Sequence, residues 1–194
     1  MSMADTFNEI PLEINEEKKL VTSSDPSIDL TNLNSLYRHM SALTIPVPPP
    51  PNQIHPARST HIQRLKDSGN AAFKASPPDY ASAHKFYTIA ISMALDRAPW
   101  EHHNIAREEM AIMYANRAAA NLGAERWPEA LADSCAVIEL KKLWTKGHFR
   151  KGKALEEMGR WKEAREAYAF GLQFEPESEE LKNALKELEK KEKK

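Results

Sequence analysis

Five side chains of this sequence have the chemistry to bind a small anion together: Lys66, Asn70, Asn116, Lys146 and Arg150. The first two are four residues apart, as are the last two, so each pair would share one face of a helix. Together they offer two ammonium groups, one guanidinium fork and two amides as hydrogen-bond donors. A ligand with two carboxylates, such as the end of a polypeptide with an acidic side chain beside its terminal carboxylate, matches this set of donors.

The last two of these residues lie in a basic run, residues 141–153, that contains no Asp or Glu. Cations gathered without acids are costly unless an anion binds among them. The same run is compatible with an ordinary solvated helix face, or with a surface for RNA or acidic lipid headgroups. The net charge of the whole chain is -1, which argues against general nucleic-acid binding.

The elements that must position these residues are repeated along the chain. A shift of 34 residues places Trp127 on Trp161, Ala130 on Ala164, Ala118 on Gly152 and Ser134 on Tyr168. Small residues at fixed spacing let two antiparallel helices pack closely, and a period of 34 is typical of a helix-pair repeat. Each pair cannot bury its apolar face alone, so neighbouring copies are expected.

A third copy lies upstream, with Gly69 in the place of Gly152 and Tyr87 in the place of Tyr168. It needs about two extra residues in the turn near 76–80, which a loop tolerates. About thirteen more are inserted around 96–108. Because proline suits the first turn of a helix, we expect Pro99 to begin a lengthened helix that reaches Leu122.

The repeat pattern predicts where the five donors lie. In a helix-pair solenoid the first helix of each pair lines the concave surface. The five residues fall on concave positions of the first helices of all three repeats, so we expect them to converge on one groove. After Pro176 a final helix with Leu181, Ala184, Leu185 and Leu188 on one face is expected to cap the last repeat.

The N-terminal region predicts a different structure. Residues 10–22 alternate apolar and polar side chains around a charged turn, which is typical of a β-hairpin. A lone hairpin is marginal in water, so it is either a frayed tail or a hairpin that finds its stabilising strand on another chain. Residues 27–43 show helical periodicity and should pack against something. Residues 44–56 are rich in proline and favour an extended connector, which serves as a spacer or docks an SH3 or WW domain.

The predicted architecture is therefore an all-α repeat domain of three helix pairs and a capping helix, preceded by a small arm with a β-hairpin and one helix. Its expected parts are a partner-binding arm at 1–43, a connector at 44–58 and the repeat domain at 59–194. Catalysis, cofactors and metals are not expected. Cys135 has no evident activating partner, Glu101, His102 and His103 would point apart on a helix, and no Gly-rich phosphate loop is present.

The segments KDSGN, YANRAAA and KGHFRKGKAL resemble the two-carboxylate clamp of tetratricopeptide-repeat co-chaperones. That family grips the C-terminal EEVD tails of cytosolic heat-shock chaperones. The resemblance implies that Lys66, Asn70 and Asn116 hold the terminal carboxylate. It implies that Lys146 and Arg150 bind the acidic side chain and nearby peptide carbonyls.

The arm, the Pro-rich connector and the segment RAPWE resemble the cytosolic tetratricopeptide subunits of the fungal Sec complexes for post-translational translocation into the endoplasmic reticulum. This resemblance implies that the arm binds a membrane-anchored sister subunit. The protein would then lie peripherally on the cytosolic face of that membrane and recruit chaperones loaded with precursors. A free soluble co-chaperone adaptor, and a structural subunit with an idle clamp, remain open alternatives.

Overall fold

The computed structural model of this chain describes residues 10–42 and 56–192, which form two compact units. One unit contains residues 10–42 together with the short segment Ala98–Glu101. The other contains the remaining described residues and carries the repeats. Each unit is described by itself below.

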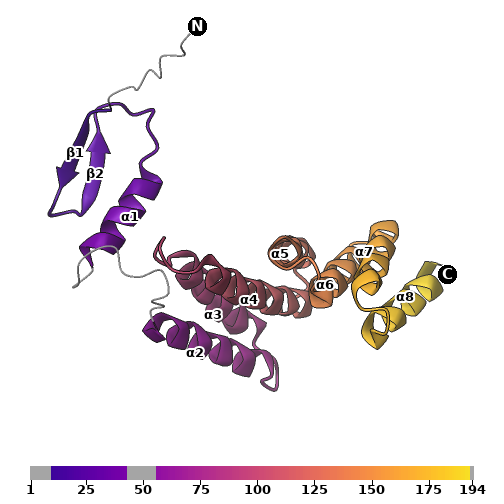
Figure 1. Cartoon of the computed structure of the whole chain (residues 1–194). Coiled ribbons are helices and arrows are strands. Elements are labelled where there is room, and N and C mark those ends of the chain that lie inside the picture. The colour runs from indigo at the N-terminus through magenta and orange to yellow at the C-terminus, as the bar shows by residue number, and fades with distance from the viewer. Residues whose placement is uncertain (1–9, 43–55, 193–194) are drawn as a thin grey trace, which may run out of the picture. The chain divides into compact units, whose positions relative to one another are not determined.

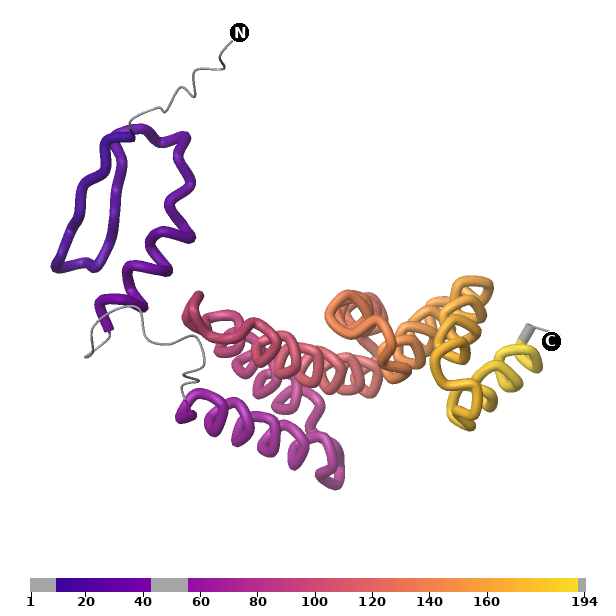
Figure 2. Tube along the Cα trace, viewed as in Figure 1, coloured from indigo at the N-terminus to yellow at the C-terminus, as the bar shows by residue number. Residues whose placement is uncertain are grey.

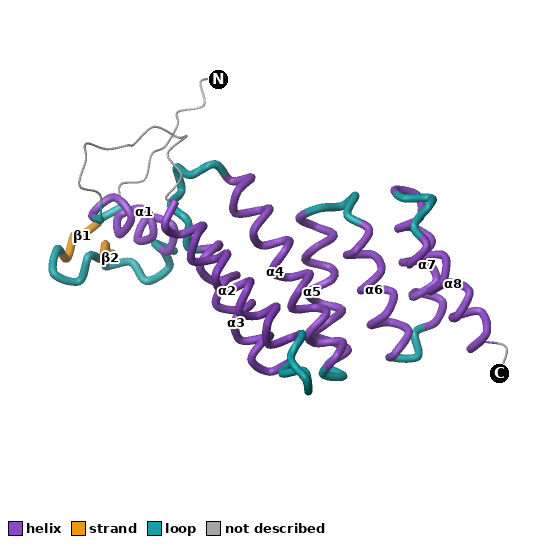
Figure 3. Tube along the Cα trace, turned by 90° about the horizontal axis from the view of Figure 1, so that it is seen from below, coloured by secondary structure: helices purple, strands orange, loops and turns teal. Residues whose placement is uncertain are grey.

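The repeat unit consists of helices in its described part: α2 (Pro56–Phe73), α3 (Tyr80–Leu95), α4 (His103–Gly123), α5 (Trp127–Leu140), α6 (Thr145–Glu157), α7 (Trp161–Phe174) and α8 (Glu179–Glu192). They pack as the pairs α2–α3, α4–α5 and α6–α7, and α8 packs on α7 (Figures 1 and 2). Figure 3 shows α4 to α8 side by side in chain order. The three helix pairs and the capping helix that the sequence predicts are thus confirmed.

Glycine lets the two helices of a pair approach closely in the first and third repeats. A Cβ atom at Gly69 would lie 2.5 Å from the ring of Tyr87, and one at Gly152 would lie 2.2 Å from the ring of Tyr168. Both distances are far below van der Waals contact, so only glycine fits under the ring. The rings themselves are buried and belong to the two hydrophobic cores of the unit.

The segment before α4 differs from the prediction. Pro99 does not lie in the first turn of α4, because the helix begins only at His103. A hydrogen bond from the Glu101 N–H to the Ala98 carbonyl closes a turn there, and His102 is extended and caps the helix through its Nδ1 atom. The insert still lengthens α4, which has 21 residues. His102 and His103 also do not point apart, since their rings stack at 5.2 Å.

The smaller unit contains the predicted hairpin. Strand β1 (Leu12–Asn15) pairs antiparallel with β2 (Leu20–Ser23), and Ile14 stands opposite Val21. Val21 is the one buried apolar side chain among the described residues of this unit. Helix α1 (Thr31–Ser41) packs on β2.

Helix α1 is shorter than the predicted 27–43. The carboxylates of Asp25 and Asp29 accept hydrogen bonds from the backbone N–H groups of Ser27 and Thr31, and such bonds favour turns over helix. The helix has no fully buried side chain within the described residues.

In the same unit the ring of Trp100 contacts the ring of His39 edge-on, at 6.0 Å between centroids.

The predicted connector is only partly described. Helix α2 begins at Pro56, so residues 56–58 of the expected connector 44–58 are helical, with proline at a position that suits a helix start. The rest of that connector lies outside the described residues. None of the described helices combines the length and the apolar composition needed to cross a bilayer.

The capping helix α8 is fixed by apolar packing and by a buried carboxylate. Leu181 and Leu188 are fully buried against the last repeat. The carboxylate of Glu156 accepts hydrogen bonds from Lys191 on α8 at 2.6 Å, from Tyr168 at 2.9 Å and from Lys153 at 3.3 Å. Burial alone would raise the pKa of Glu156, but these donors outweigh it and lower the pKa below its ordinary value.

Replacing Glu156 by Gln keeps the shape of this side chain and removes its charge. We expect the free energy of unfolding at neutral pH to fall by about 1–3 kcal/mol, as measured by urea denaturation. Because the folded-state pKa lies below 4.5, the charge stabilises the fold above that pH, and its contribution is lost as the pH falls through the folded-state pKa. The difference between the two proteins should therefore shrink below pH 4.5. Glu157→Gln, at the exposed neighbouring position, is the control; a loss equal to that of Glu156→Gln would contradict this role.

Candidate functional site

Three adjacent helices carry the five predicted donors. Lys66 and Asn70 lie on α2, Asn116 lies on α4, and Lys146 and Arg150 lie on α6. Helix α4 contacts both α2 and α6, so the first helices of the three repeats are direct neighbours. This arrangement follows from the repeat, because each second helix packs behind its own first helix and leaves the first helices in one row.

The two asparagines meet across the α2–α4 boundary. The Nδ2 atom of Asn116 donates to the Oδ1 atom of Asn70 at 3.3 Å. The hydroxyl of Tyr87, on α3, donates to the same oxygen at 2.8 Å. Both asparagines are half-buried. The structure therefore brings two of the predicted residues into contact and adds a third residue that the site prediction did not include.

Arg150 is a half-buried cation with no hydrogen-bonded or ion-paired acid among the described residues. Its Nη1 atom is buried and has no hydrogen-bond partner, and the guanidinium forms no ion pair with the residues that the structure describes. Burial lowers the pKa of Arg150, and the charge of Glu180 and the phenol of Tyr87 partly oppose this effect. The guanidinium thus lies within electrostatic range of the residue that hydrogen-bonds Asn70.

The two lysines are also unpaired among the described residues. Lys66 is half-buried on the same helix as Asn70, one turn earlier. Lys146 is exposed, and its Nζ atom lies 5.9 Å from the centroid of the Trp144 ring, a distance suited to a cation–π contact. A carboxylate-bearing ligand would supply the acceptors that these cations lack.

Among the described residues, several other basic side chains of the repeat unit form ion pairs with acids, unlike Lys66, Lys146 and Arg150. Arg117 forms a two-pronged ion pair with Asp133, with bonds of 3.0 and 2.7 Å. Lys141, in the basic run, donates to Glu108 at 2.6 Å. No group of His, Cys, Asp and Glu that could hold a metal ion is found in the described part of the chain.

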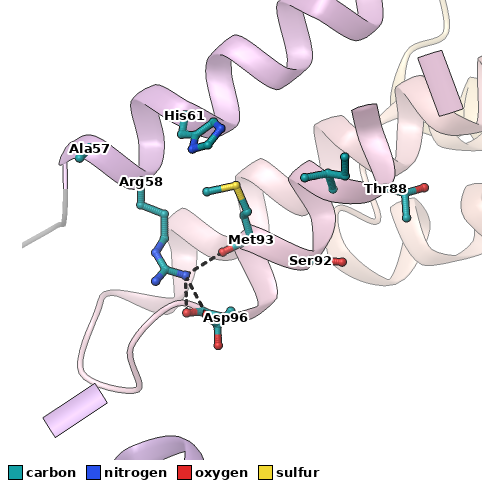
Figure 4. A pocket seen from close by; sticks show the side chains of 8 residues that line it. Ala57, Arg58, His61, Thr88, Ser92, Met93 and Asp96 are labelled. Carbon is teal, nitrogen blue, oxygen red and sulfur yellow. Dashed lines mark hydrogen bonds and ion pairs between the residues drawn. The ribbon is translucent and has the colours of Figure 1, made fainter. Parts of the chain in front are cut away.

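A separate pocket of about 640 Å³ lies between α2 and α3 (Figure 4). Its lining includes His61, Ile89 and Met93 but none of the five donors. Arg58 is the cation there, and its Nη1 atom already donates to the backbone carbonyls of Met93 and Asp96. The pocket is therefore no second anion site.

The comparisons with known proteins agree with this fold. No protein-family model matches the chain. It is 31% identical to the TPR domain of OM64 from Arabidopsis, with a TM-score of 0.57, over 69% of this chain and 98% of that domain. The chain belongs to the tetratricopeptide-repeat family.

Within that family the chain is a homologue of a translocation subunit. It is 41% identical, over 128 residues, to the ER protein translocation subcomplex subunit sec67 of Schizosaccharomyces pombe. It is 36% identical over 125 residues to the protein STIP1 homolog of Dictyostelium discoideum. The matches span 66% of this chain and 66% of sec67, and 64% of this chain and 20% of the STIP1 homolog.

Two solved structures are informative about the arm and the repeats. A chain in the Sec complex from S. cerevisiae is 28% identical with a TM-score of 0.75, and the match covers 93% of this chain and 97% of that chain. A match of that extent includes part of the N-terminal arm as well as the repeats. The second TPR domain of human RPAP3, determined with the HSP70 peptide SGPTIEEVD, is 26% identical with a TM-score of 0.56, over 68% of this chain and 98% of that chain.

The absence of a partner for Arg150 leads to a stability prediction. Arg150→Met removes a partly desolvated, unpaired charge and should leave the free energy of unfolding unchanged or raise it by about 1 kcal/mol. Arg117→Met is the matched control, because it leaves the buried carboxylate of Asp133 without its cation; it should lower that free energy by about 3–5 kcal/mol. Chemical denaturation of both variants measures the difference. A large loss of stability in Arg150→Met would show that Arg150 holds the fold together.

Proposed function

We propose that this protein is a non-enzymatic adaptor that binds the C-terminal EEVD-type tail of a cytosolic heat-shock chaperone through the five donors on α2, α4 and α6. The observation that carries the proposal is the half-buried guanidinium of Arg150, whose Nη1 atom lacks an acceptor and which interacts electrostatically with Tyr87, the residue that hydrogen-bonds Asn70. A buried polar group without a partner is costly, so its retention is best explained by a ligand that supplies one. The tail of a polypeptide with a neighbouring acidic side chain supplies two such anions.

The roles of the donors follow from their chemistry and their helices. Lys66, Asn70 and Asn116 lie on α2 and α4 and would hold the terminal carboxylate. Lys146 and Arg150 lie on α6 and would bind the acidic side chain and nearby carbonyls, for which the guanidinium fork is well suited. The related domain of RPAP3 was determined with a peptide that ends in EEVD, which supports this class of ligand.

The expected affinity is modest. A charge-assisted hydrogen bond contributes roughly 1.5–3 kcal/mol, but ordering a flexible tail consumes part of this. A dissociation constant on the order of micromolar, about -8 kcal/mol, is consistent with release of a delivered cargo. Binding should weaken with salt, because Lys146 is exposed to solvent.

Binding of RNA or acidic lipid to the basic run is less well supported. Lys141 is already paired with Glu108, and Lys153 is paired with Glu156. These ion pairs reduce the field that a polyanion would meet on that face. The tail-binding proposal needs only Lys146 and Arg150 from this run.

The arm offers a surface for a second partner. The Val21 N–H and carbonyl are hydrogen-bonded by the side chain of Asn34, at 2.6 and 3.0 Å, so they point away from β1. Because backbone groups alternate in direction along an antiparallel pair, Leu12 and Ile14 direct theirs to the outer edge of β1. Their side chains are 47% and 63% exposed. Within residues 10–42 and 56–192 no strand pairs with this edge of β1, and an open apolar edge favours the addition of a strand from another chain.

We infer that this partner is a membrane-anchored sister subunit of a translocation complex, since the homologue sec67 is a subunit of an ER translocation subcomplex. The protein would then reside peripherally on the cytosolic face of the endoplasmic reticulum. The match to the Sec-complex chain extends into the arm, which favours this assignment over a free co-chaperone adaptor.

Tail binding can be tested with a peptide ending in EEVD. The free acid should bind the full chain, and the amidated peptide should bind at least tenfold more weakly, because one anion is lost. Arg150→Glu and Lys146→Glu should each abolish binding of the free acid, as measured by calorimetry. Lys162→Glu, an exposed change on α7, is the matched control and should bind as the unaltered chain does. Equal affinity for acid and amide would refute the clamp.

Membrane association can be tested in the full chain by sedimentation with endoplasmic-reticulum membranes. Ile14→Asn should reduce the bound fraction severalfold, since it puts an amide on the apolar edge, while tail binding stays unchanged. Glu13→Asn alters the neighbouring position on the other face of the strand and should have no effect. If both variants sediment like the unaltered chain, the arm is not the attachment surface.

A further inference from the structure

The Tyr87 hydroxyl reaches from the hydrophobic core to one of the five predicted donors. The side chain is 1% exposed, and its ring packs so closely against α2 that a Cβ at Gly69 would lie 2.5 Å from it. Its oxygen donates to the Oδ1 atom of Asn70 at 2.8 Å. A hydroxyl group that is held by core packing thus donates a hydrogen bond to Asn70, a residue of the proposed site.

The amide of Asn70 can face the groove in two orientations with opposite chemistry. One presents the Nδ2 donor and the other presents the Oδ1 acceptor. In the structure Oδ1 accepts from both the Tyr87 hydroxyl and the Asn116 amide, so Nδ2 remains available to donate. The reversed orientation would turn an acceptor toward a carboxylate and leave the buried Tyr87 proton without an acceptor.

We propose that Tyr87 is a positioning residue for tail binding: its hydroxyl holds the Asn70 amide with the donor toward the terminal carboxylate. This inference rests on the proposed function. Tyr87 itself does not touch the ligand, because its hydroxyl proton is engaged by Asn70. Its effect reaches Asn116 as well, since Asn116 shares the same acceptor atom.

The equivalent positions in the other repeats differ, which makes the role specific to the first. Tyr168 occupies this position in the third repeat, over Gly152, but its hydroxyl donates to Glu156 at 2.9 Å. Ser134 occupies it in the second repeat and donates to the carbonyl of Ala130 in its own helix. Among these three hydroxyls, only that of Tyr87 reaches one of the five predicted donors.

The phenol of Tyr87 remains a donor near neutral pH. Burial raises its pKa, and the nearby charge of Arg150 offsets this only in part. A Phe side chain keeps the ring that packs over Gly69 and removes only the hydroxyl. Tyr87→Phe in the full chain is therefore the informative change, and Tyr168→Phe is its matched control.

The test compares the affinities of EEVD-terminated peptides, as free acid and as amide. Tyr87→Phe should weaken binding of the free acid by about 5- to 20-fold, as expected for a lost or misdirected hydrogen bond to a charged group. Affinity for the amide should be unaffected, so the ratio of the two affinities falls. Tyr168→Phe should lower thermal stability and leave this ratio unchanged.

A second measurement does not depend on a variant. In NMR spectra of the ¹⁵N-labelled, unaltered chain, the side-chain amide signal of Asn70 should shift on addition of the free acid and much less with the amide. An unmoved Asn70 signal, or an unchanged ratio in Tyr87→Phe, would overturn the role of Tyr87. If the unaltered chain itself fails to distinguish acid from amide, or Arg150→Glu still binds, the proposed function fails instead.

Discussion

The close contact between a glycine and a tyrosine ring in the first and third repeats is the constraint on which the rest of the structure depends. With no side chain at Gly69 or Gly152, the rings of Tyr87 and Tyr168 lie directly against the first helix of each pair. This contact sets the spacing of the two helices and therefore the line of first helices that carries the donors. It also brings each phenol hydroxyl to a polar side chain of that first helix, Asn70 in one repeat and Glu156 in the other.

The distribution of acids explains why the proposed groove presents mainly donors. Buried cations elsewhere are matched with carboxylates, as in Arg97 with Glu109 and Arg117 with Asp133. Arg150 lacks such a partner among the described residues. A half-buried cation without an ion pair is a common sign of a binding site, because natural proteins often keep functional groups at some cost in stability.

The sequence predicted the repeats, and it placed the five candidate donors on the first helices of those repeats, because both depend on local periodicity. The 34-residue period fixes which residues face the neighbouring helix, and i, i+4 spacing fixes which side chains share a face. Helix ends were predicted less well. Pro99 and the start of α1 differ because single hydrogen bonds, such as those of His102 and Asp29, decide where a helix begins. Such choices among nearby polar groups leave no periodic signal.

The contacts between repeats could not be predicted for a related reason. That Asn116, Asn70 and Tyr87 share one acceptor depends on the tertiary packing of three helices, which periodicity does not specify. The buried position of Val21 likewise depends on where α1 packs and on the side chain of Asn34. The sequence could therefore propose which residues form the site and which helices carry them, whereas the contact between Asn70 and Asn116 is known only from the structure.

Tyr87 and Tyr168 make the same contact with a glycine, but their hydroxyl groups bond different partners. The residue after the glycine is Asn70 in the first repeat and Lys153 in the third. Lys153 is drawn to Glu156, the acid that also accepts from Tyr168 and from Lys191 on the capping helix. In the third repeat the phenol therefore secures the end of the solenoid. In the first repeat no acid stands at the position equivalent to Glu156. The Tyr87 hydroxyl therefore bonds the Asn70 amide instead, and in our proposal the donors near it can bind an anion from another molecule.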